Sequence, residues 1–319
     1  MLKTAGILSC PLPEKILERH SWSGCPAKKG AQIRTSRFFG PVKQRSGELL
    51  RQGKMTPFLL AWLFFTVLLM PSHSEVCRAP SDIPEPFWES YGTVDLSHNF
   101  NDSTIYWDDD GYYRLNVTIY NSTREGWFQE DIIENVIHGG THLDSPVHFY
   151  KDGWDATQIP LERLLFLPVA RVDVRDKVAL NSEYLLSTDD ILNWEERHGR
   201  LPSGCLFVVH TGQSKHWPNR AAYMGIDANG EKHFPALDPE AAEFLATRRS
   251  VFGVGLDTPS VDAGSGSAAH RALMRINIFV LENLVGLEQI PARGAYALVL
   301  PLKLDGASGS PVRVVALVP

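Results

Sequence analysis

Three histidines, one aspartate and two adjacent glycines lie within eleven residues of this chain, in the run HGGTHLDSPVH from His138 to His148. A core histidine needs one hydrogen-bond partner and a surface histidine needs none, so ordinary packing explains one member of this run but not four together. Neutral imidazole nitrogens and carboxylate oxygens are the usual ligands of zinc and similar divalent ions. The run therefore predicts a metal site, and the fold must bring these side chains together.

The backbone of this run is expected to form a tight loop. His138 and His142 have the spacing of residues on one helix face, but Gly139, Gly140 and Pro146 disfavour a continuous helix. Glycine also lets the backbone pass close to a bound ion or substrate, where a Cβ atom would obstruct it.

Charge is distributed unevenly along the 319 residues. Residues 1–54 contain 11 Lys and Arg against three Glu and no Asp, which leaves 20 basic and 34 acidic residues after position 54. The remainder carries a formal charge of −14, which disfavours nucleic acid as a partner. The chain is long enough, and with 44% hydrophobic residues apolar enough, to bury a large core.

Residues 55–74 resemble a signal peptide. Phe58 to Met70 are apolar except for Thr66, and this run is too short for the roughly 20 residues that span a bilayer. Small residues stand at positions −3 and −1 of a cleavage site before Glu75, namely Ser72 and Ser74. We therefore expect a protein of the secretory route with no stable membrane span.

Two explanations remain for a signal peptide that begins 55 residues into the chain. Either translation starts at Met55, which we favour, or the basic segment is a cytosolic tail before a short signal anchor. The predicted organisation is a basic, disordered leader or upstream extension (1–54), a signal peptide (55–74) and one domain of about 245 residues (75–319).

Sequons and cysteines agree with an oxidising, glycosylating compartment. Three acceptor asparagines, Asn101, Asn116 and Asn121, cluster in one polar segment. After residue 74 only two cysteines remain, Cys77 and Cys205. They form either one disulfide or a pair of free buried thiols, and the sequence does not decide between the two.

Short apolar segments alternate with helical patterns, which predicts a mixed α/β fold. The candidate strands, rich in β-formers and bounded by turn residues, are 166–174, 206–210, 251–256, 276–281, 295–302 and 312–318. A helix is predicted over 188–198, ended by Gly199, and another after the N-cap Asp238 and Pro239. Several strands lack polar alternation, as expected of strands covered on both faces.

The histidine run resembles the HxGTHxDxPxH motif of the metal-dependent cyclase family, which includes bacterial-type kynurenine formamidases and isatin hydrolases. A second feature of that family is a histidine twelve positions before a glutamate that precedes Asn-Leu, and His270 with Glu282-Asn283-Leu284 matches it. The segment from Gly253 to Ser260 is also similar. The resemblance covers roughly Asp95 to the C-terminus.

The resemblance implies a swivelling β/β/α fold with a barrel-like core, a homo-oligomer, and one or two divalent ions in each subunit. Zinc is our first expectation and manganese the second. The first ion would be held by His138, His142 and Asp144, and the second by Asp144, His270 and Glu282. His148 is then the candidate general acid and base.

These assignments predict a metal-dependent amidohydrolase resembling arylformamidase, which converts N-formyl-L-kynurenine and water to L-kynurenine and formate. A divalent ion lowers the pKa of bound water toward about 7 and polarises a carbonyl. The aromatic substrate would lie against aromatic side chains, for which the candidates are Phe149, Tyr150, Trp154 and Trp217. Two alternatives stay open: hydrolysis of a cyclic amide or lactone such as isatin, and a catalytically silent secreted binding protein on the same fold.

Overall fold

The structure is a computed structural model that describes residues 90–122 and 126–319. Residues Ile83–Pro319 form one compact unit. The predicted leader, the predicted signal peptide and Cys77 lie outside the described residues. Within the described part of the chain, no helix is both long and apolar enough to cross a membrane.

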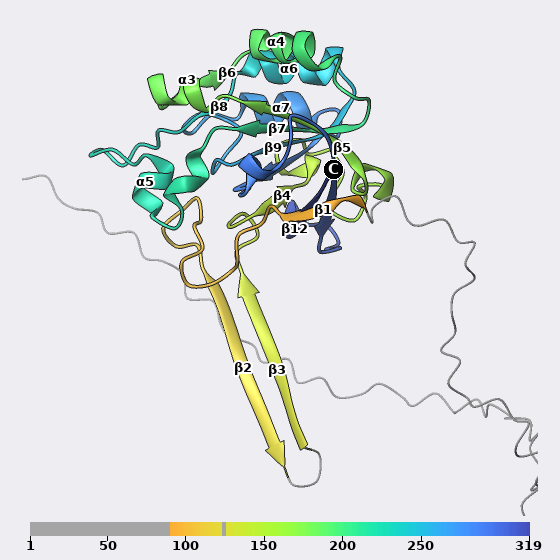
Figure 1. The fold of residues 1–319 in the computed structure, drawn as a ribbon. Coiled ribbons are helices and arrows are strands. Elements are labelled where there is room, and N and C mark those ends of the chain that lie inside the picture. Colours follow the sequence, from red (N-terminus) through yellow and green to blue (C-terminus); the bar gives the residue numbers. More distant parts are fainter. Residues whose placement is uncertain (1–89, 123–125) are drawn as a thin grey trace, which may run out of the picture. The chain divides into compact units, whose positions relative to one another are not determined.

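A closed eight-stranded sheet forms the centre of this unit (Figure 1). Its strands follow the order β1-β12-β11-β5-β7-β9-β10-β4, and β12 also pairs with β4, which closes the sheet into a barrel. Four consecutive strands in the middle of the sheet, β5, β7, β9 and β10, run parallel to one another. The bounds are β1 Gly92–Asp95, β4 His142–Asp144, β5 Leu167–Asp173, β7 Cys205–His210, β9 Val251–Leu256, β10 Phe279–Glu282, β11 Arg293–Pro301 and β12 Gly309–Val318.

The barrel separates two hydrophobic cores, and β7 shows how. All six of its residues are buried. Leu206 and Val208 face the core inside the barrel, whereas Phe207 and Val209 face a second core beneath the helices. The absence of polar alternation in this strand is thus explained by cover on both faces, as the sequence predicted.

Helices cover the outer face of the parallel strands (Figure 1). The bounds of these helices are α3 Arg175–Leu180, α4 Thr188–His198, α6 Pro239–Arg248 and α7 Ala268–Met274, whereas α5 Arg220–Met224 packs in a separate small cluster with Ile105. Helix α4 begins with a capping box, in which Ser187 and Asp190 exchange side-chain and backbone hydrogen bonds. Helix α6 begins at Pro239 after the N-cap Asp238, and both helices have the bounds that the sequence predicted.

Short elements complete the connections. Strands β6 Leu185–Leu186 and β8 Ala236–Leu237 pair in parallel beside the helices. Single turns of 3-10 helix are η2 Pro146–His148, η3 Leu161–Arg163, η4 Gln213–His216 and η5 Leu287–Gln289.

Two sequence predictions of local structure need correction. The strand expected over 276–281 begins only at Phe279, because the chain turns through Asn277 at φ 61° after α7. The polar segment that carries the sequons is a long hairpin of β2 Tyr113–Ser122 and β3 Gly126–Asn135, paired over ten residues. Its mixture of polar and apolar residues had indicated only a glycosylated surface.

Cys205 is a buried free thiol at the start of β7. Burial raises its pKa to about 12, so it is protonated at neutral pH. This agrees with the free-thiol alternative for Cys205, although Cys77 is not described.

Candidate metal centre

The middle of the histidine run is a strand and not the expected loop, and the strand sets the direction of its side chains. Along β4, His142 and Asp144 point to the same side, since side chains alternate across a strand. Leu143 between them points into the core inside the barrel and is fully buried. Anchoring by Leu143 therefore holds both predicted ligands at the outer surface of the barrel wall.

The distant half of the cluster arrives through strand pairing and a helix. Glu282 ends β10, and the antiparallel register places it directly opposite His142. His270 lies in the first turn of α7, and its Nε2 is 3.2 Å from Asp144 Oδ2 and 3.3 Å from Glu282 Oε1. The eleven residues between His270 and Glu282 form the rest of α7, the following turn and the first three residues of β10.

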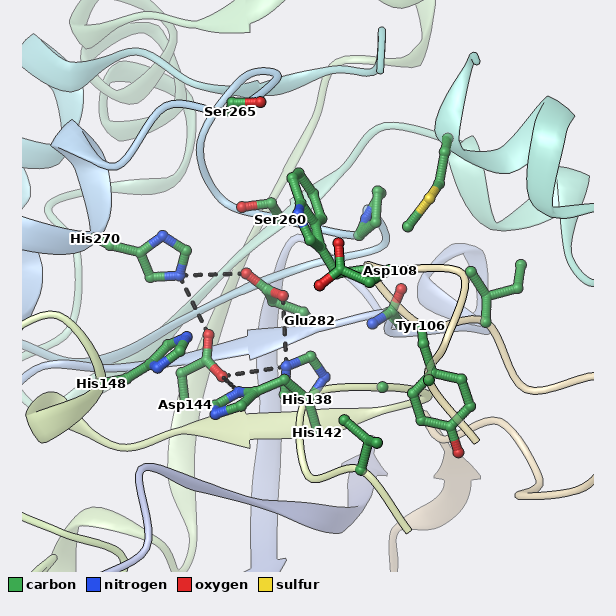
Figure 2. A pocket seen from close by; sticks show the side chains of 18 of the residues that line it. Tyr106, Asp108, His138, His142, Asp144, His148, Ser260, Ser265, His270 and Glu282 are labelled. Carbon is green, nitrogen blue, oxygen red and sulfur yellow. Dashed lines mark hydrogen bonds and ion pairs between the residues drawn. The ribbon is translucent and has the colours of Figure 1, made fainter. Parts of the chain in front are cut away.

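Asp144 is the centre of the cluster (Figure 2). Its Oδ1 lies 2.6 Å from His138 Nδ1 and 3.1 Å from His142 Nε2, while its Oδ2 faces His270. Two sets of potential ligand atoms, each within 4.8 Å of one another, share this carboxylate: His138, His142 and Asp144 form one, and Asp144, His270 and Glu282 the other. The structure thus brings together all five predicted ligands, in the two predicted groups.

Neighbouring groups orient the imidazole rings. His142 Nδ1 lies 3.1 Å from the carbonyl of Gly140, which also accepts a hydrogen bond from Asn283 Nδ2. His270 Nδ1 lies 2.7 Å from Asp262 Oδ2, and the same carboxylate accepts the backbone N–H groups of Ala269 and His270. These partners hold each ring so that its Nε2 faces Asp144. Carbonyl and carboxylate groups orient metal-bound histidines in the same way.

The two glycines of the run have a different purpose from the one expected. A Cβ on Gly139 would lie 2.0 Å from the ring of Tyr106, and one on Gly140, which has φ +57°, would lie 2.8 Å from Phe100. The two glycines thus permit close packing of the aromatic rings of Tyr106 and Phe100. These contacts do not show the expected role of making room for an ion or substrate.

The protonation of the cluster is set by strong opposing effects. Burial alone would lower the pKa of His142, but the negative charges of Asp144 and Glu282 outweigh it and raise the pKa to about 9. Burial also opposes the shift in His270, whose pKa Asp144, Asp262 and Glu282 hold well above its usual value. Burial would raise the pKa of Asp144, yet the surrounding imidazoles keep it well below its usual range.

The donor set fits a divalent ion. His142 Nε2 is buried and makes no hydrogen bond, although it lies 3.1 Å from Asp144 Oδ1 and 3.5 Å from Glu282 Oε2. A buried polar atom without a hydrogen bond is costly unless another partner binds it. A cation held by these nitrogens and carboxylates would bind that atom, and it would replace the imidazole protons whose positive charge otherwise balances the carboxylates.

His148 lies at the edge of the cluster, at the end of η2. Its ring stacks on His138 with centroids 3.9 Å apart, and Phe149 beside it stacks on His270 at 4.4 Å. Burial lowers the pKa of His148 to about 4, with smaller contributions from the neighbouring imidazoles. The ring is therefore neutral at pH 7 and free to accept a proton.

A cavity of about 550 Å³ opens over the cluster. Of the four aromatic residues predicted to line the substrate site, Phe149 lines this cavity. The others lie elsewhere: Trp154 packs against the core inside the barrel, Trp217 stacks on His98 at 4.0 Å, and Tyr150 is 37% exposed. Neither proximity to the motif nor aromatic character was therefore sufficient to identify the side chains that line the cavity.

The aromatic wall comes instead from a segment that the sequence did not single out. Tyr106, Trp107 and Asp108 line the cavity, and Figure 2 shows Tyr106 and Asp108 beside the cluster. Ser260 and Ser267, from the segment between β9 and α7, line another side. The only sequence signal for Tyr106 was its place in a Tyr- and Asp-rich stretch, which did not identify a wall.

Comparison with known proteins agrees with this geometry. The family model described as "Putative cyclase" matches residues 94–263, which include His138, His142, Asp144 and His148. Isatin hydrolase of Roseibium aggregatum is 36% identical over 193 residues, 57% of this chain and 72% of the relative. Kynurenine formamidase of Geobacillus thermodenitrificans is 31% identical over 225 residues, 69% of this chain and 94% of the relative.

The fold is likewise similar to a solved structure. Isatin hydrolase A from Labrenzia aggregata, bound to benzyl benzoate, matches with a TM-score of 0.65 and 31% identity over 72% of this chain and 94% of that one.

Proposed function

Because the chain belongs to the cyclase family, we propose that it is a divalent-metal-dependent amidohydrolase that cleaves the C–N bond of an aromatic amide. One observation carries the proposal: five ionisable side chains from three distant segments converge, buried or half-buried, on one shared carboxylate beneath a cavity. Burying so many charges without a bound cation would be costly. We propose zinc as the ion and manganese as the next candidate, since imidazole and carboxylate ligands suit both.

The residues of the site would have three different roles in hydrolysis. His138, His142, Asp144, His270 and Glu282 would hold one or two ions, whose chemistry is to lower the pKa of water and polarise the carbonyl. His148, neutral at pH 7, accepts the water proton and returns it to the leaving nitrogen. Phe149 and Trp107 provide apolar surface for an aromatic ring, and burial of the cluster excludes bulk water.

N-formyl-L-kynurenine is our first substrate candidate, and the products would be L-kynurenine and formate. A cavity of about 550 Å³ lies within the range of small-molecule sites, and its aromatic side chains suit an aryl amide. Isatin, a cyclic aromatic amide, is the second candidate. The 36% identity to an isatin hydrolase supports it.

A substrate panel tests the proposal. Purified protein is assayed with N-formylkynurenine, isatin and simple aryl formamides, with and without a chelator. We expect turnover of at least one amide that chelation abolishes. Turnover that is insensitive to chelator would refute the metal mechanism, and no turnover at full metal occupancy would instead support a silent binding protein.

The role of His148 has its own test. His148→Ala should lose about 10²- to 10⁴-fold in kcat, as expected for loss of a general acid and base, while retaining its metal. A fall in metal content would show that His148 is a ligand.

We also propose that the protein is secreted and glycosylated. All three acceptor asparagines are exposed, with Asn101 in a turn and Asn116 and Asn121 on β2. Digestion of the protein from a secreting eukaryotic culture with an N-glycosidase should lower its mass, and Asn116→Gln should remove one glycan. An unchanged mass after digestion would contradict this proposal.

A further inference from the structure

His138 differs from the other two histidines of the metal centre in the ring nitrogen that it turns toward Asp144. Its Nδ1 lies 2.6 Å from Asp144 Oδ1, whereas His142 and His270 turn their Nε2 atoms toward the same carboxylate (Figure 2). Those two rings are held at Nδ1, one by a backbone carbonyl and the other by a carboxylate. A group that holds the ring of His138 must therefore contact its Nε2.

Ser308 meets this requirement from the segment between β11 and β12. Its Oγ lies 2.8 Å from His138 Nε2, although the two residues are 170 positions apart in the sequence. A neutral imidazole that offers Nδ1 to a cation carries its proton on Nε2, and a hydroxyl oxygen can accept the hydrogen bond from that N–H group. Ser308 thus stands in the same relation to His138 as Asp262 does to His270.

The backbone around Ser308 is fixed by contacts with the histidine run itself. The Ser145 N–H donates a 2.8 Å hydrogen bond to the carbonyl of Ser308. The next residue, Gly309, pairs with Asp144 in the antiparallel register of β12 and β4. Strand pairing therefore sets the position of the Ser308 hydroxyl relative to the cluster.

Gly309 lets this segment approach the imidazole closely. A Cβ atom at this position would lie 2.6 Å from the carbonyl oxygen of Leu143 and 2.8 Å from His138 Cε1. Both distances are too short for atoms that are not bonded, so a side chain here would displace the strand or the ring. The absence of a side chain at Gly309 therefore allows β12 to bring the Ser308 hydroxyl to the imidazole.

A further contact links the orientation of His138 to the candidate general acid and base. The rings of His138 and His148 stack with centroids 3.9 Å apart and planes at 14° to one another. Rotation of one stacked ring removes contacts from the other, so rotation of His138 would disturb the surface on which His148 packs. A group that holds the His138 ring therefore also helps to hold His148.

We propose that Ser308 is a positioning residue of this site. Its hydroxyl holds the ring of His138 with Nδ1 facing the position of the ion, and through the stacked rings it holds His148 in place for proton transfer. The first part rests on the proposed metal site, and the second rests on the proposed hydrolase activity.

Zinc affinity tests the first part. Ser308→Ala removes the hydrogen-bond acceptor, and loss of such a partner commonly costs 10- to 100-fold in metal affinity. We expect the dissociation constant for zinc, measured by competition with a chromophoric chelator, to rise at least about tenfold. Ser308→Thr keeps the hydroxyl and should restore an affinity close to that of the wild type.

Ser203→Ala is the matched control, because it also removes one serine hydrogen bond between distant segments, in this case to Ser250. It should bind zinc as the wild type does. An unchanged zinc affinity in folded Ser308→Ala, or an equal loss in both alanine variants, would overturn the positioning role. A wild type that binds neither zinc nor manganese would overturn the metal site and this proposal together.

Nuclear magnetic resonance of the zinc-loaded wild type tests the ring orientation without any substitution. Long-range correlations between the ring protons and the ring nitrogens distinguish a metal-bound Nδ1 from a metal-bound Nε2. One histidine should bind zinc through Nδ1 and carry its proton on Nε2. If every zinc-bound histidine carries its proton on Nδ1, the orientation assigned to His138 is wrong.

Kinetics at equal metal content test the second part. Ser308→Ala should lower kcat several-fold and leave KM nearly unchanged, since Ser308 is not among the residues that line the cavity. An unchanged kcat would overturn the link to His148 while leaving the role in metal binding intact. Absence of all turnover in the wild type would count against the proposed hydrolase, and the zinc-affinity result would stand.

Discussion

The metal centre and the hairpin of β2 and β3, here called the arm, depart from the usual distribution of polar and apolar groups in opposite directions. At the metal centre, Asp144, His142, His270 and Glu282 are all at most 5% exposed, whereas the arm exposes eight large apolar side chains. Burial of charge and exposure of apolar surface are each costly for an isolated chain. The buried charge of the first region therefore indicates a bound cation, and the apolar side chains of the second are not covered by any described part of the chain.

The largest effect on metal content and activity is expected at the metal centre, where the buried charge is concentrated. Asp144→Asn removes the carboxylate that both ligand groups share, so metal content should fall and kcat/KM should drop by at least about 10³-fold, a loss of about 4 kcal/mol of transition-state stabilisation. Elemental analysis and the hydrolysis assay measure both. The exposed Asp152→Asn is the matched control and should behave as wild type. Normal metal content in Asp144→Asn would contradict the assigned ligand set.

A smaller loss of metal affinity is expected for a residue that contacts a ligand but would not bind the ion itself. Asp262→Asn weakens the contact that orients His270, and such changes commonly cost 10- to 100-fold in metal affinity. Competition with a chromophoric chelator measures the affinity. If Asp262 has a purely structural role, the melting temperature will fall while the affinity stays unchanged.

Protons and the cation should compete for the same buried atoms. The pKa of His142 is raised to about 9 in the metal-free cluster, so its imidazole must lose a proton before it can bind an ion. The apparent metal affinity should therefore rise by up to about tenfold for each pH unit and each proton released, and should level off above about pH 9. An affinity that is flat between pH 6.5 and 8.5 would show that no proton is displaced.

The smallest effect is expected where the two regions meet. Tyr106→Phe removes the hydrogen bond to Asn135 at the base of the arm and keeps the ring that packs on Gly139. Chemical denaturation should show a loss of about 1 kcal/mol in the free energy of unfolding. A change in metal content would mean instead that Tyr106 affects the ligands directly.

Much of the metal centre was predictable from the sequence, since His138, His142, Asp144, His270 and Glu282 all belong to motifs with fixed spacing. Six of the eight barrel strands were also predictable, because strands such as β7 and β9 are apolar runs between turn residues, whereas β1 was not identified and β4 was expected to be a loop. The aromatic side chains that line the cavity were not predictable. Trp154 and Trp217 were placed at the substrate on composition, yet tertiary packing turns one into the core and stacks the other on His98.

The arm escaped prediction for a different physical reason. Strand patterns are identified by one apolar and one polar face, but both faces of the arm mix the two kinds of residue. Asp262 was missed because a carboxylate in a glycine- and serine-rich loop shows no sign of its partner until the fold brings His270 beside it.

The most direct test of the account is the metal dependence of hydrolysis by the purified wild-type protein. Metal is removed with a chelator, and zinc and manganese are then titrated back while amide hydrolysis and bound metal are measured together. The account predicts that activity disappears with the metal and returns in proportion to one or two ions bound per chain. Full hydrolytic activity in protein shown to be metal-free would contradict it.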